Sequence, residues 1–275
     1  MATFSLDEVC AVRKPKDAWW TVLLVDPVAV PLTRVLANRT AITPDQITVA
    51  AFLLGIGAAG CFAQGSALWL VAGAVLYHVA FVLDCCDGKI ARLKGNGSPF
   101  GGWLDFMLDR VRDICCAAAL AGGQYAVTGE AAYLWLGFAI LALDMLRYLN
   151  GPKLARAGGQ MREAIALAQG PRHAKAPGKP SRYVRVRDRL MAHRIRPHLF
   201  SGIEFQMAVF IVGPLTGLII PVAAVAGALL LLFELVLVYR FWRLARAYGR
   251  VPESVRKAVS QDPVPHPRPT LVDLR

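Results

Sequence analysis

The chain has 275 residues, 56% of them apolar, and a mean hydropathy of +0.45 that comes from long apolar blocks. Blocks of about 20 residues match the thickness of a bilayer, so the composition excludes an ordinary soluble domain and predicts an all-α integral membrane protein. The net charge of +12 does not imply a nucleic-acid partner, because the basic residues gather at the ends of these blocks.

The segment before the first apolar block, residues 1–43, has the character of a membrane-surface element. Residues 13–33 join a basic start and a Trp-Trp pair to an apolar stretch that Pro27 and Pro31 interrupt. Basic residues beside Trp and apolar residues favour an amphipathic helix in the membrane interface over a membrane span. We therefore expect residues 1–43 to form a cytosolic N-terminus with an interfacial helix.

Six apolar blocks follow, and we expect each to form a transmembrane helix. They cover about residues 46–63, 67–83, 102–127, 131–149, 199–216 and 218–239, the second continuing as a helix through an Asp-rich segment. The last two blocks meet at Gly217, which predicts a tight hairpin. The six helices form one domain over residues 44–245, in which residues 150–198 are a basic cytosolic loop. Residues 246–275 form a cytosolic tail.

The positions of the 31 Lys and Arg residues set the orientation. With the N-terminus in the cytosol, the loops on the opposite side fall near residues 64–66, 128–130 and 216–218, and none contains Lys or Arg. This is the positive-inside pattern, and it places both termini in the cytosol. We expect the 150–198 loop to bind anionic membrane lipid or, alternatively, an anionic substrate.

Four aspartates near two adjoining helix ends are the most informative feature. Asp84 and Asp87 are three residues apart on the second helix, and Asp105 and Asp109 are four apart on the third. Each pair therefore shares a helix face. The connection between the helices is short and contains two Gly and a Pro, so the helices should pack as antiparallel neighbours. The four carboxylates would then converge at the cytosolic edge of the bilayer.

A carboxylate cluster near lipid is costly unless it is neutralised, because like charges repel and lose solvation. Two Mg²⁺ or Mn²⁺ ions fit best, since hard cations prefer oxygen ligands and carboxylates can bridge them. A salt-bridged helix pair, with Arg92, Arg110 and Arg112 as partners, is the purely structural alternative. Gly88 and Gly101 argue against it, because glycine weakens a helix but lets a backbone approach a phosphate closely.

The segment from Asp84 to Asp109 has the pattern D-x2-D-G-x2-A-R-x8-G-x3-D-x3-D. It resembles the signature of the CDP-alcohol phosphotransferase family at all eight fixed positions. Six helices preceded by an amphipathic helix also resemble that family's architecture. The resemblance covers residues 13–127 well and is weak beyond Leu149.

The resemblance implies a role for each matching residue. Asp84, Asp87 and Asp105 would hold the two metal ions, and Asp109 would be a further ligand or the general base. Asp45 departs from the family pattern, because family members often carry an amide side chain at this position. The residues implied to bind the nucleotide are Gly88, Ala91, Arg92, Gly101, Thr43 and Asp45.

The resemblance also implies a reaction. This is metal-dependent transfer of a phosphate-linked alcohol group from a CDP-alcohol donor to an acceptor hydroxyl, with release of CMP, in phospholipid synthesis. Asp109 is placed to accept the proton of that hydroxyl, and no Ser, Cys or His is placed as a nucleophile, so we expect direct transfer. CDP-diacylglycerol is the favoured donor, with a soluble polyol or polyol phosphate as acceptor. The alternative is a soluble CDP-alcohol that donates its head group to a lipid alcohol.

Two other classes of protein could account for the same residues. A membrane cation transporter would spread acidic residues and broken helices through the bilayer, whereas these aspartates cluster on one side. A catalytically inactive scaffold would not need all eight motif residues. Pairing of two copies as a homodimer through the membrane helices remains open.

Three more acidic residues lie in the apolar blocks. Glu204 follows the basic loop at the start of the fifth block, and it either borders an acceptor pocket or pairs locally. Asp144 and Glu234 lie near arginines and are better explained by local ion pairs. His78 is better explained as a packed helix residue.

Overall fold

The computed structural model describes residues 3–169 and 181–261, and all regular secondary structure in these residues is helical. This confirms the predicted all-α fold. The elements in chain order are α1 (Leu6–Ala11), the π-helix η1 (Thr21–Val25), α2 (Asp26–Arg39), α3 (Pro44–Ala63), α4 (Ala67–Lys94), α5 (Pro99–Thr128), α6 (Ala132–Gln169), α7 (Arg182–Ala192), α8 (Gly202–Met207), the π-helix η2 (Ala208–Val212), α9 (Gly213–Thr216), α10 (Ile219–Tyr248) and α11 (Glu253–Gln261).

In these two described ranges, five helical stretches are long and apolar enough to cross a bilayer, in agreement with an integral membrane protein. They are Thr21–Arg39, Pro44–Ala63, Ala67–Lys94, Ala132–Gln169 and Ile219–Tyr248. Two predicted spans are not in this set: α5, which carries several charges, and the helix over Gly202–Thr216, which is shorter. Six crossings therefore stay a prediction.

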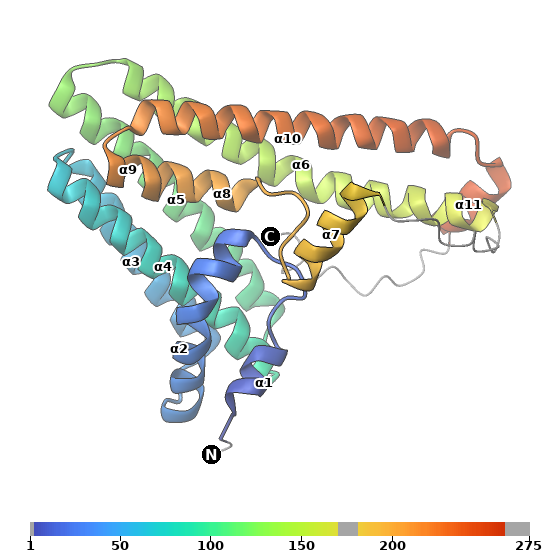
Figure 1. Ribbon diagram of the computed structural model, residues 1–275, viewed down its shortest axis with the longest axis horizontal. Helices are drawn as coiled ribbons and strands as arrows, with labels where there is room; N and C mark the ends of the chain where they lie inside the picture. The colour runs from blue at the N-terminus through green and yellow to red at the C-terminus, as the bar shows by residue number, and fades with distance from the viewer. Residues whose placement is uncertain (1–2, 170–180, 262–275) are drawn as a thin grey trace.

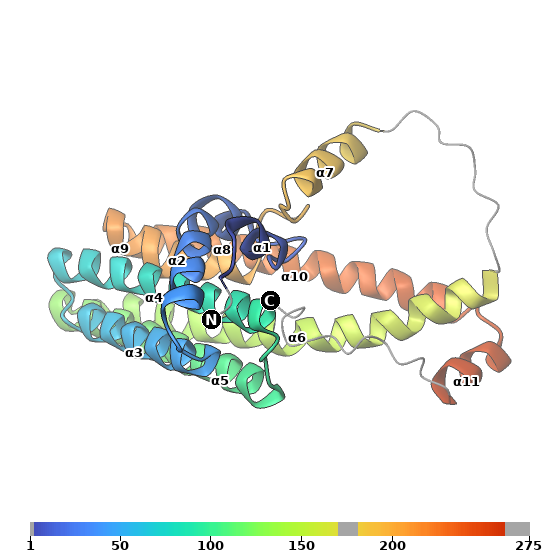
Figure 2. The same ribbon diagram turned by 90° about the horizontal axis from the view of Figure 1, so that it is seen from below.

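The N-terminal helix begins and ends later than the 13–33 segment predicts. Instead of being interrupted by proline, it continues from η1 through Pro27 and Pro31 to Arg39. Pro27 directly follows η1, so the helix takes a wider π-helical turn just where proline cannot donate a backbone hydrogen bond. Figure 2 shows α2 running across the direction of α3, α4 and α10, the orientation expected of an interfacial helix. By length and composition alone the same stretch would also suit a span.

The 150–198 segment is not the continuous loop that was predicted. α6 runs on through Pro152 to Gln169, and α7 occupies Arg182–Ala192, while residues 170–180 lie outside the described part of the chain. The residues after Pro152 are rich in Ala, Leu, Arg and Gln, which are strong helix formers. They also pack along α10 and against α11. Figure 1 shows the α6–α10 pair extending well beyond the other helices.

The predicted hairpin is confirmed. Gly217 separates α9 from α10 with a φ of 72°, a left-handed conformation that glycine adopts without steric cost. The tail predicted from residue 246 instead begins within α10 and continues into α11. Residues 262–275 lie outside the described residues.

The core lies where α3, α4 and α5 meet the segment from α8 to α9. Three fully buried rings mark it: the Phe210 centroid is 4.9 Å from that of Tyr77 and 6.4 Å from that of Phe62. From this end of the bundle, α3 to α5 slope away from α6 and α10 (Figure 1). The helices therefore separate toward the end where the aspartates lie.

A close approach between α5 and the α3–α4 turn ties this core together. A Cβ added to Gly123 would lie 2.3 Å from the carbonyl oxygen of Phe62 and 2.8 Å from that of Ala63. The next residue, Gln124, donates from Nε2 to the Gly65 carbonyl oxygen at 2.7 Å. The two backbones can therefore meet only because residue 123 has no side chain.

We expect Gly123→Ala to destabilise the purified protein by about 1–3 kcal/mol, because the added methyl would push α5 away from α3. The thermal unfolding midpoint in detergent should fall by several degrees. Gly122→Ala is the matched control, since a Cβ there meets nothing within 4 Å and alanine favours the helix. Equal midpoints for the two variants would contradict the close approach.

Candidate active site

The two motif helices, α4 and α5, are joined by a short turn that sets their carboxylates side by side. α4 ends at Gly95, whose φ of 64° reverses the chain. Ser98 then caps α5, accepting a hydrogen bond from the Gly101 backbone N–H at 2.8 Å, and Pro99 occupies the first turn. An αL glycine followed by an N-cap serine thus reverses the chain as predicted, but the predicted direct packing of α4 on α5 is wrong, because both helices pack mainly against α3.

Three of the four aspartates come together. Asp84, Asp105 and Asp109 each offer a carboxylate oxygen, and these three atoms lie within 4.8 Å of one another. Asp84 and Asp109 are buried and Asp105 is half-buried. Three oxygen donors from two helices fit a hard divalent cation, and without one their mutual repulsion would be costly.

Asp87 belongs to the same cavity but not to the closest cluster. Its Oδ2 accepts a hydrogen bond from Thr48 Oγ1 of α3 at 2.6 Å, and both side chains are buried. The structure therefore brings together three of the four predicted metal-binding residues. Binding of two ions, which would need Asp87 as well, stays a prediction.

A small cavity of about 60 Å³ opens at the carboxylates. Gly88 and Arg92, two of the predicted nucleotide-binding residues, line it together with Asp84, Asp87 and Asp105. Four further cations contribute to its wall: Arg13, Lys14, Lys89 and Arg194. Acidic and basic groups thus line the same cavity, the acidic ones able to hold a cation and the basic ones an anion.

The other predicted nucleotide-binding residues lie elsewhere. Thr43 caps α3, accepting a hydrogen bond from the Gln46 backbone N–H at 3.3 Å. Asp45 lies against Gly101, where a Cβ would come within 2.5 Å of its Oδ1, so this glycine makes room for the carboxylate. Ala91 faces the turn after α4, 3.5 Å from the Cβ position of Gly97. A direct nucleotide contact by these residues stays a prediction.

A buried carboxylate that the sequence reasoning missed supports the basic wall of the cavity. Asp26 of α2 binds Lys89 Nζ at 3.0 Å through one oxygen and Arg194 Nη1 at 2.9 Å through the other. Arg194 has a φ of 63°, which is unusual for a residue with a side chain and persists only where the surroundings enforce it. An acidic residue inside an apolar stretch was the signal for this site.

A second network lies behind Asp109. Arg112 Nη1 binds Asp109 Oδ1 at 2.9 Å, and Arg112 also donates to Asp113 Oδ1 at 3.2 Å. The Tyr77 hydroxyl donates to the same Asp113 oxygen at 2.9 Å. Gly55 of α3 leaves space for the arginine stem, because a Cβ there would lie 2.3 Å from Arg112 Cδ. Asp109 is therefore held by a buried arginine that is itself anchored.

The network continues through Asp113 into the rest of the bundle. Asp113 Oδ2 accepts from Arg110 Nη2 at 2.9 Å and from Gln206 Nε2 of α8 at 2.7 Å. Arg110 also binds Asp144 at 2.6 Å and lies over the Tyr148 ring at 3.5 Å. Asp144 is thus ion-paired, but the prediction of a local pair is wrong, because its arginine comes from α5 and not from its own helix. Residues of α4, α5, α6 and α8 all contribute to one polar cluster.

The remaining two acidic candidates, Glu234 and Glu204, form ion pairs or hydrogen bonds with nearby side chains. Glu234 binds Arg147 of α6 at 3.2 Å and accepts from Asn150 Nδ2 at 2.7 Å, so it is ion-paired across two helices and not locally as predicted. Glu204 is buried at the start of α8 and accepts from Ser201 Oγ at 2.8 Å. It lines neither the carboxylate cavity nor the larger pocket beside it, so its role in an acceptor pocket stays a prediction.

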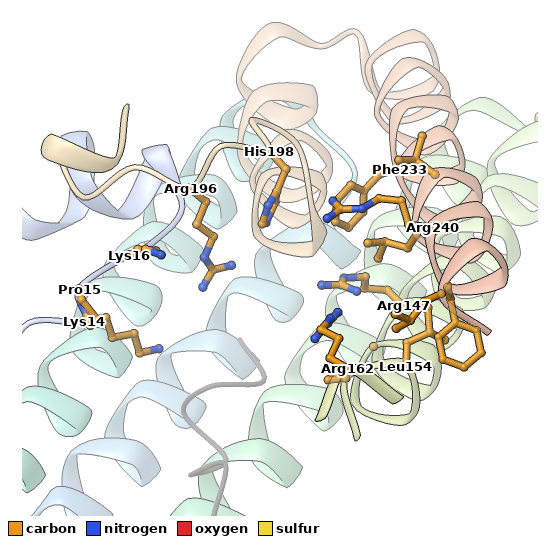
Figure 3. Close-up of a pocket in the computed structure, with 16 residues that line it drawn as sticks. Lys14, Pro15, Lys16, Arg147, Leu154, Arg162, Arg196, His198, Phe233 and Arg240 are labelled. Carbon is orange, nitrogen blue, oxygen red and sulfur yellow. The ribbon is translucent and has the colours of Figure 1, made fainter. Parts of the chain in front are cut away.

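That larger pocket, of about 790 Å³, lies between the N-terminal segment and the α6–α10 pair (Figure 3). Its described lining contains no acidic residue. Burial and the nearby Arg196, Arg147 and Arg240 lower the pKa of His198 to about 4, so this imidazole is neutral at pH 7. The cations that line the pocket are Lys14, Lys16, Arg147, Arg162, Arg196 and Arg240.

Comparison with known proteins finds one matching family model and several similar proteins. A family model described as CDP-alcohol phosphatidyltransferase matches residues 41–166. An archaetidylinositol phosphate synthase of Methanothermobacter thermautotrophicus is 38% identical over 89 residues, which are 32% of this chain and 44% of that protein.

Two further relatives show the same partial coverage. A bifunctional IPC transferase and DIPP synthase of Thermococcus kodakarensis is 38% identical over 102 residues, 37% of this chain and 22% of that protein. A phosphatidylinositol phosphate synthase of Corynebacterium glutamicum is 33% identical over 102 residues, 37% of this chain and 41% of that protein. The chain spans less than half the length of each of these relatives.

Proposed function

We propose that this chain, whose residues 41–166 match the CDP-alcohol phosphatidyltransferase family model, is a transferase of phospholipid synthesis. It would transfer a phosphatidyl group from CDP-diacylglycerol, or a related CDP-linked lipid, to the hydroxyl of a phosphorylated polyol and release CMP. The relatives named as synthases of archaetidylinositol phosphate and phosphatidylinositol phosphate support a phosphorylated acceptor of this kind.

The basic pocket is the observation that supports a phosphorylated acceptor. Six cations and no acidic residue line its described wall, so it favours a ligand with a dianionic phosphate over a neutral polyol. Its volume of about 790 Å³ is that of a small-molecule site, with room for a sugar-sized alcohol. The pocket adjoins the carboxylate cavity, as a site for the second substrate must.

The carboxylate cavity would hold the donor. Asp84, Asp105 and Asp109 are the residues that would bind Mg²⁺ or Mn²⁺, which would offset negative charge on the donor's diphosphate. Gly88 leaves the cavity open on the α4 side, and Arg92 adds a cation at its edge. Asp109 would accept the proton of the acceptor hydroxyl, while Arg112 holds one of its two oxygens in place.

The same proposal assigns a side of the membrane. The two cavities lie among the basic segments that the positive-inside pattern places in the cytosol, so a soluble acceptor would enter from the cytosol while the lipid tails of the donor stay in the bilayer. Both termini would be cytosolic as well.

Release of CMP by the purified protein tests the proposal. With Mg²⁺ or Mn²⁺ present, CDP-diacylglycerol and inositol phosphate should yield CMP, whereas CDP-diacylglycerol with unphosphorylated inositol should not. CMP release from a soluble CDP-alcohol and diacylglycerol would instead support transfer of a head group to a lipid. If no pair of substrates gives CMP, the proposal of an enzyme is contradicted. The interpretations that then stand are a membrane cation transporter and a catalytically inactive scaffold.

We expect Arg240→Met to raise the KM for the phosphorylated acceptor by about 10–100-fold and to change kcat little, because a charge-assisted contact to phosphate would be lost. Arg243→Met is the matched control, since Arg243 is an exposed residue of the same helix, α10, and lines neither cavity. A KM that is the same for both variants would remove the pocket as the acceptor site.

A further inference from the structure

The N-terminal segment between α1 and η1 lies between the two cavities. Lys14 lines both the carboxylate cavity and the basic pocket. Its neighbours divide between them, since Pro15 and Lys16 line the basic pocket and Asp17 lines the carboxylate cavity. In Figure 3 the Lys14 side chain reaches into the basic pocket from one side, opposite Arg147.

The backbone at Lys14 is held in place by a segment 180 residues away in the chain. Arg194 donates to the Lys14 carbonyl oxygen from Nε at 3.0 Å and from Nη2 at 2.8 Å. The Asp17 N–H donates to the Arg194 carbonyl at 2.8 Å, and the Arg196 N–H donates to the Asp17 carbonyl at 2.9 Å. This fixes the position of the chain from which the lysine side chain extends.

Two further contacts tie the same segment to the motif helix α4. Arg92 donates from Nε to the Val12 carbonyl oxygen at 2.7 Å. Arg194 is bound in turn to Asp26, which also binds Lys89 of the motif. Lys14 is therefore anchored, through its backbone, to the helix that carries Asp84 and Asp87, so that its position relative to these carboxylates is defined.

We propose that the Lys14 ammonium contacts the phosphoryl group that passes between the two substrates. This inference rests on the proposed function. In the transfer, the acceptor hydroxyl oxygen forms a bond to the lipid-linked phosphorus of the donor, and the bond from that phosphorus to the CMP oxygen breaks. The hydroxyl proton goes to Asp109, and the electron pair of the broken bond leaves on CMP.

A cation between the two cavities would reduce the repulsion between the two substrates in this step. The phosphorus under attack keeps its charged oxygens while the acceptor brings a second phosphate close to it, and the two anions repel one another. A lysine that lines both spaces can bring its ammonium group between the two anions and offset this repulsion. A preorganised positive group gains most where the charges approach most closely. Lysine suits the task because its compact charge lies at the end of a flexible stem.

Full-length protein carrying Lys14→Met tests the inference. We expect kcat for CMP release, with CDP-diacylglycerol and inositol phosphate both saturating, to fall at least about 100-fold, as for loss of one group that stabilises transition-state charge. The KM of each substrate should change less than about fivefold, because other cations line both cavities. Lys14→Arg, which keeps the charge, should recover at least a tenth of the wild-type kcat.

The control is Lys153→Met, which removes an exposed lysine of α6 that lines neither cavity and should leave kcat unchanged. A kcat of Lys14→Met within threefold of wild type, or an effect confined to the acceptor KM, would overturn the inference. Equal loss in Lys14→Met and Lys14→Arg with a lowered unfolding midpoint would also overturn it, in favour of a structural role. If the wild-type protein itself releases no CMP, the proposed function fails first.

Discussion

Asp109→Asn will reduce CMP release by about 10³-fold or more while the folded protein still binds the CDP-linked donor. Asp109 lies with Asp84 and Asp105 in the carboxylate cluster, and an amide there has neither the negative charge nor the basicity of the carboxylate. Loss of a general base alone costs about 10²–10⁴ in rate. The asparagine keeps the size and can still accept a hydrogen bond from Arg112.

Binding of Mn²⁺, measured by electron paramagnetic resonance on the same variant, separates the two roles open to Asp109. A tenfold or greater loss of Mn²⁺ affinity would show that Asp109 is a metal ligand, whereas unchanged affinity with lost turnover would show a base. Asp188→Asn is the matched control, because Asp188 is exposed on α7 and pairs only with its neighbour Arg187 in the described contacts. Normal turnover by Asp109→Asn would reject the assignment.

Arg112→Gln will lower the free energy of unfolding by about 3 kcal/mol. The arginine is almost fully buried and serves Asp109 and Asp113 at once, and removing one partner of a buried ion pair costs about 3–5 kcal/mol because a charge is left uncompensated. Asp113 keeps Arg110, Tyr77 and Gln206 as partners, which places the expected cost at the lower end of that range.

The measurement is thermal or denaturant unfolding in detergent, with Arg185→Gln as the control because Arg185 is exposed on α7. Surface changes of this kind normally alter stability by less than about 0.5 kcal/mol. An Arg112→Gln variant as stable as the control would show that the Asp109–Arg112–Asp113 contacts contribute nothing to the fold.

The convergence of the aspartates was predictable because it depends on local geometry. Spacings of three and four residues put each pair on one helix face, and a Gly- and Pro-containing turn made the helices antiparallel. Asp87 departed from the expected cluster because its other neighbour, Thr48, belongs to α3. The position of α3 against α4 is a matter of side-chain packing between helices, which spacing along one helix does not determine.

The alternative that residues 150–198 bind an anionic substrate anticipated part of the basic pocket, since Arg162 and Arg196 line it, but the pocket as a whole was not predictable from the chain. Its cations come from the N-terminal segment, α6, the α7–α8 connection and α10, and in the sequence each of them fits the positive-inside pattern equally well. The Lys14 backbone in particular is held by Arg194, which lies 180 residues away in the chain. Long-range contacts of this kind carry no periodic signal.

The extent of α6 shows a third limit. The apolar block ends near Leu149, and a basic segment that begins with Gly and Pro is typical of a loop. The helix nevertheless continues to Gln169, because α10 and α11 pack against its polar extension. Ala164 and Val259 form a small second core there. Tertiary packing thus overrides the local signal for a helix end.

The polar cluster around Asp113 also bears on the order in which the helices enter the bilayer during synthesis. A charged residue at the centre of an inserting helix costs about 2.5–3.5 kcal/mol, so α5, as the predicted third span, would be costly to insert alone. Tyr77 of α4 precedes it and can pair at once, but Gln206 is made 93 residues after Asp113. We therefore expect α5 to wait beside α4 near the translocon and to settle fully into lipid only when α8 has been translated.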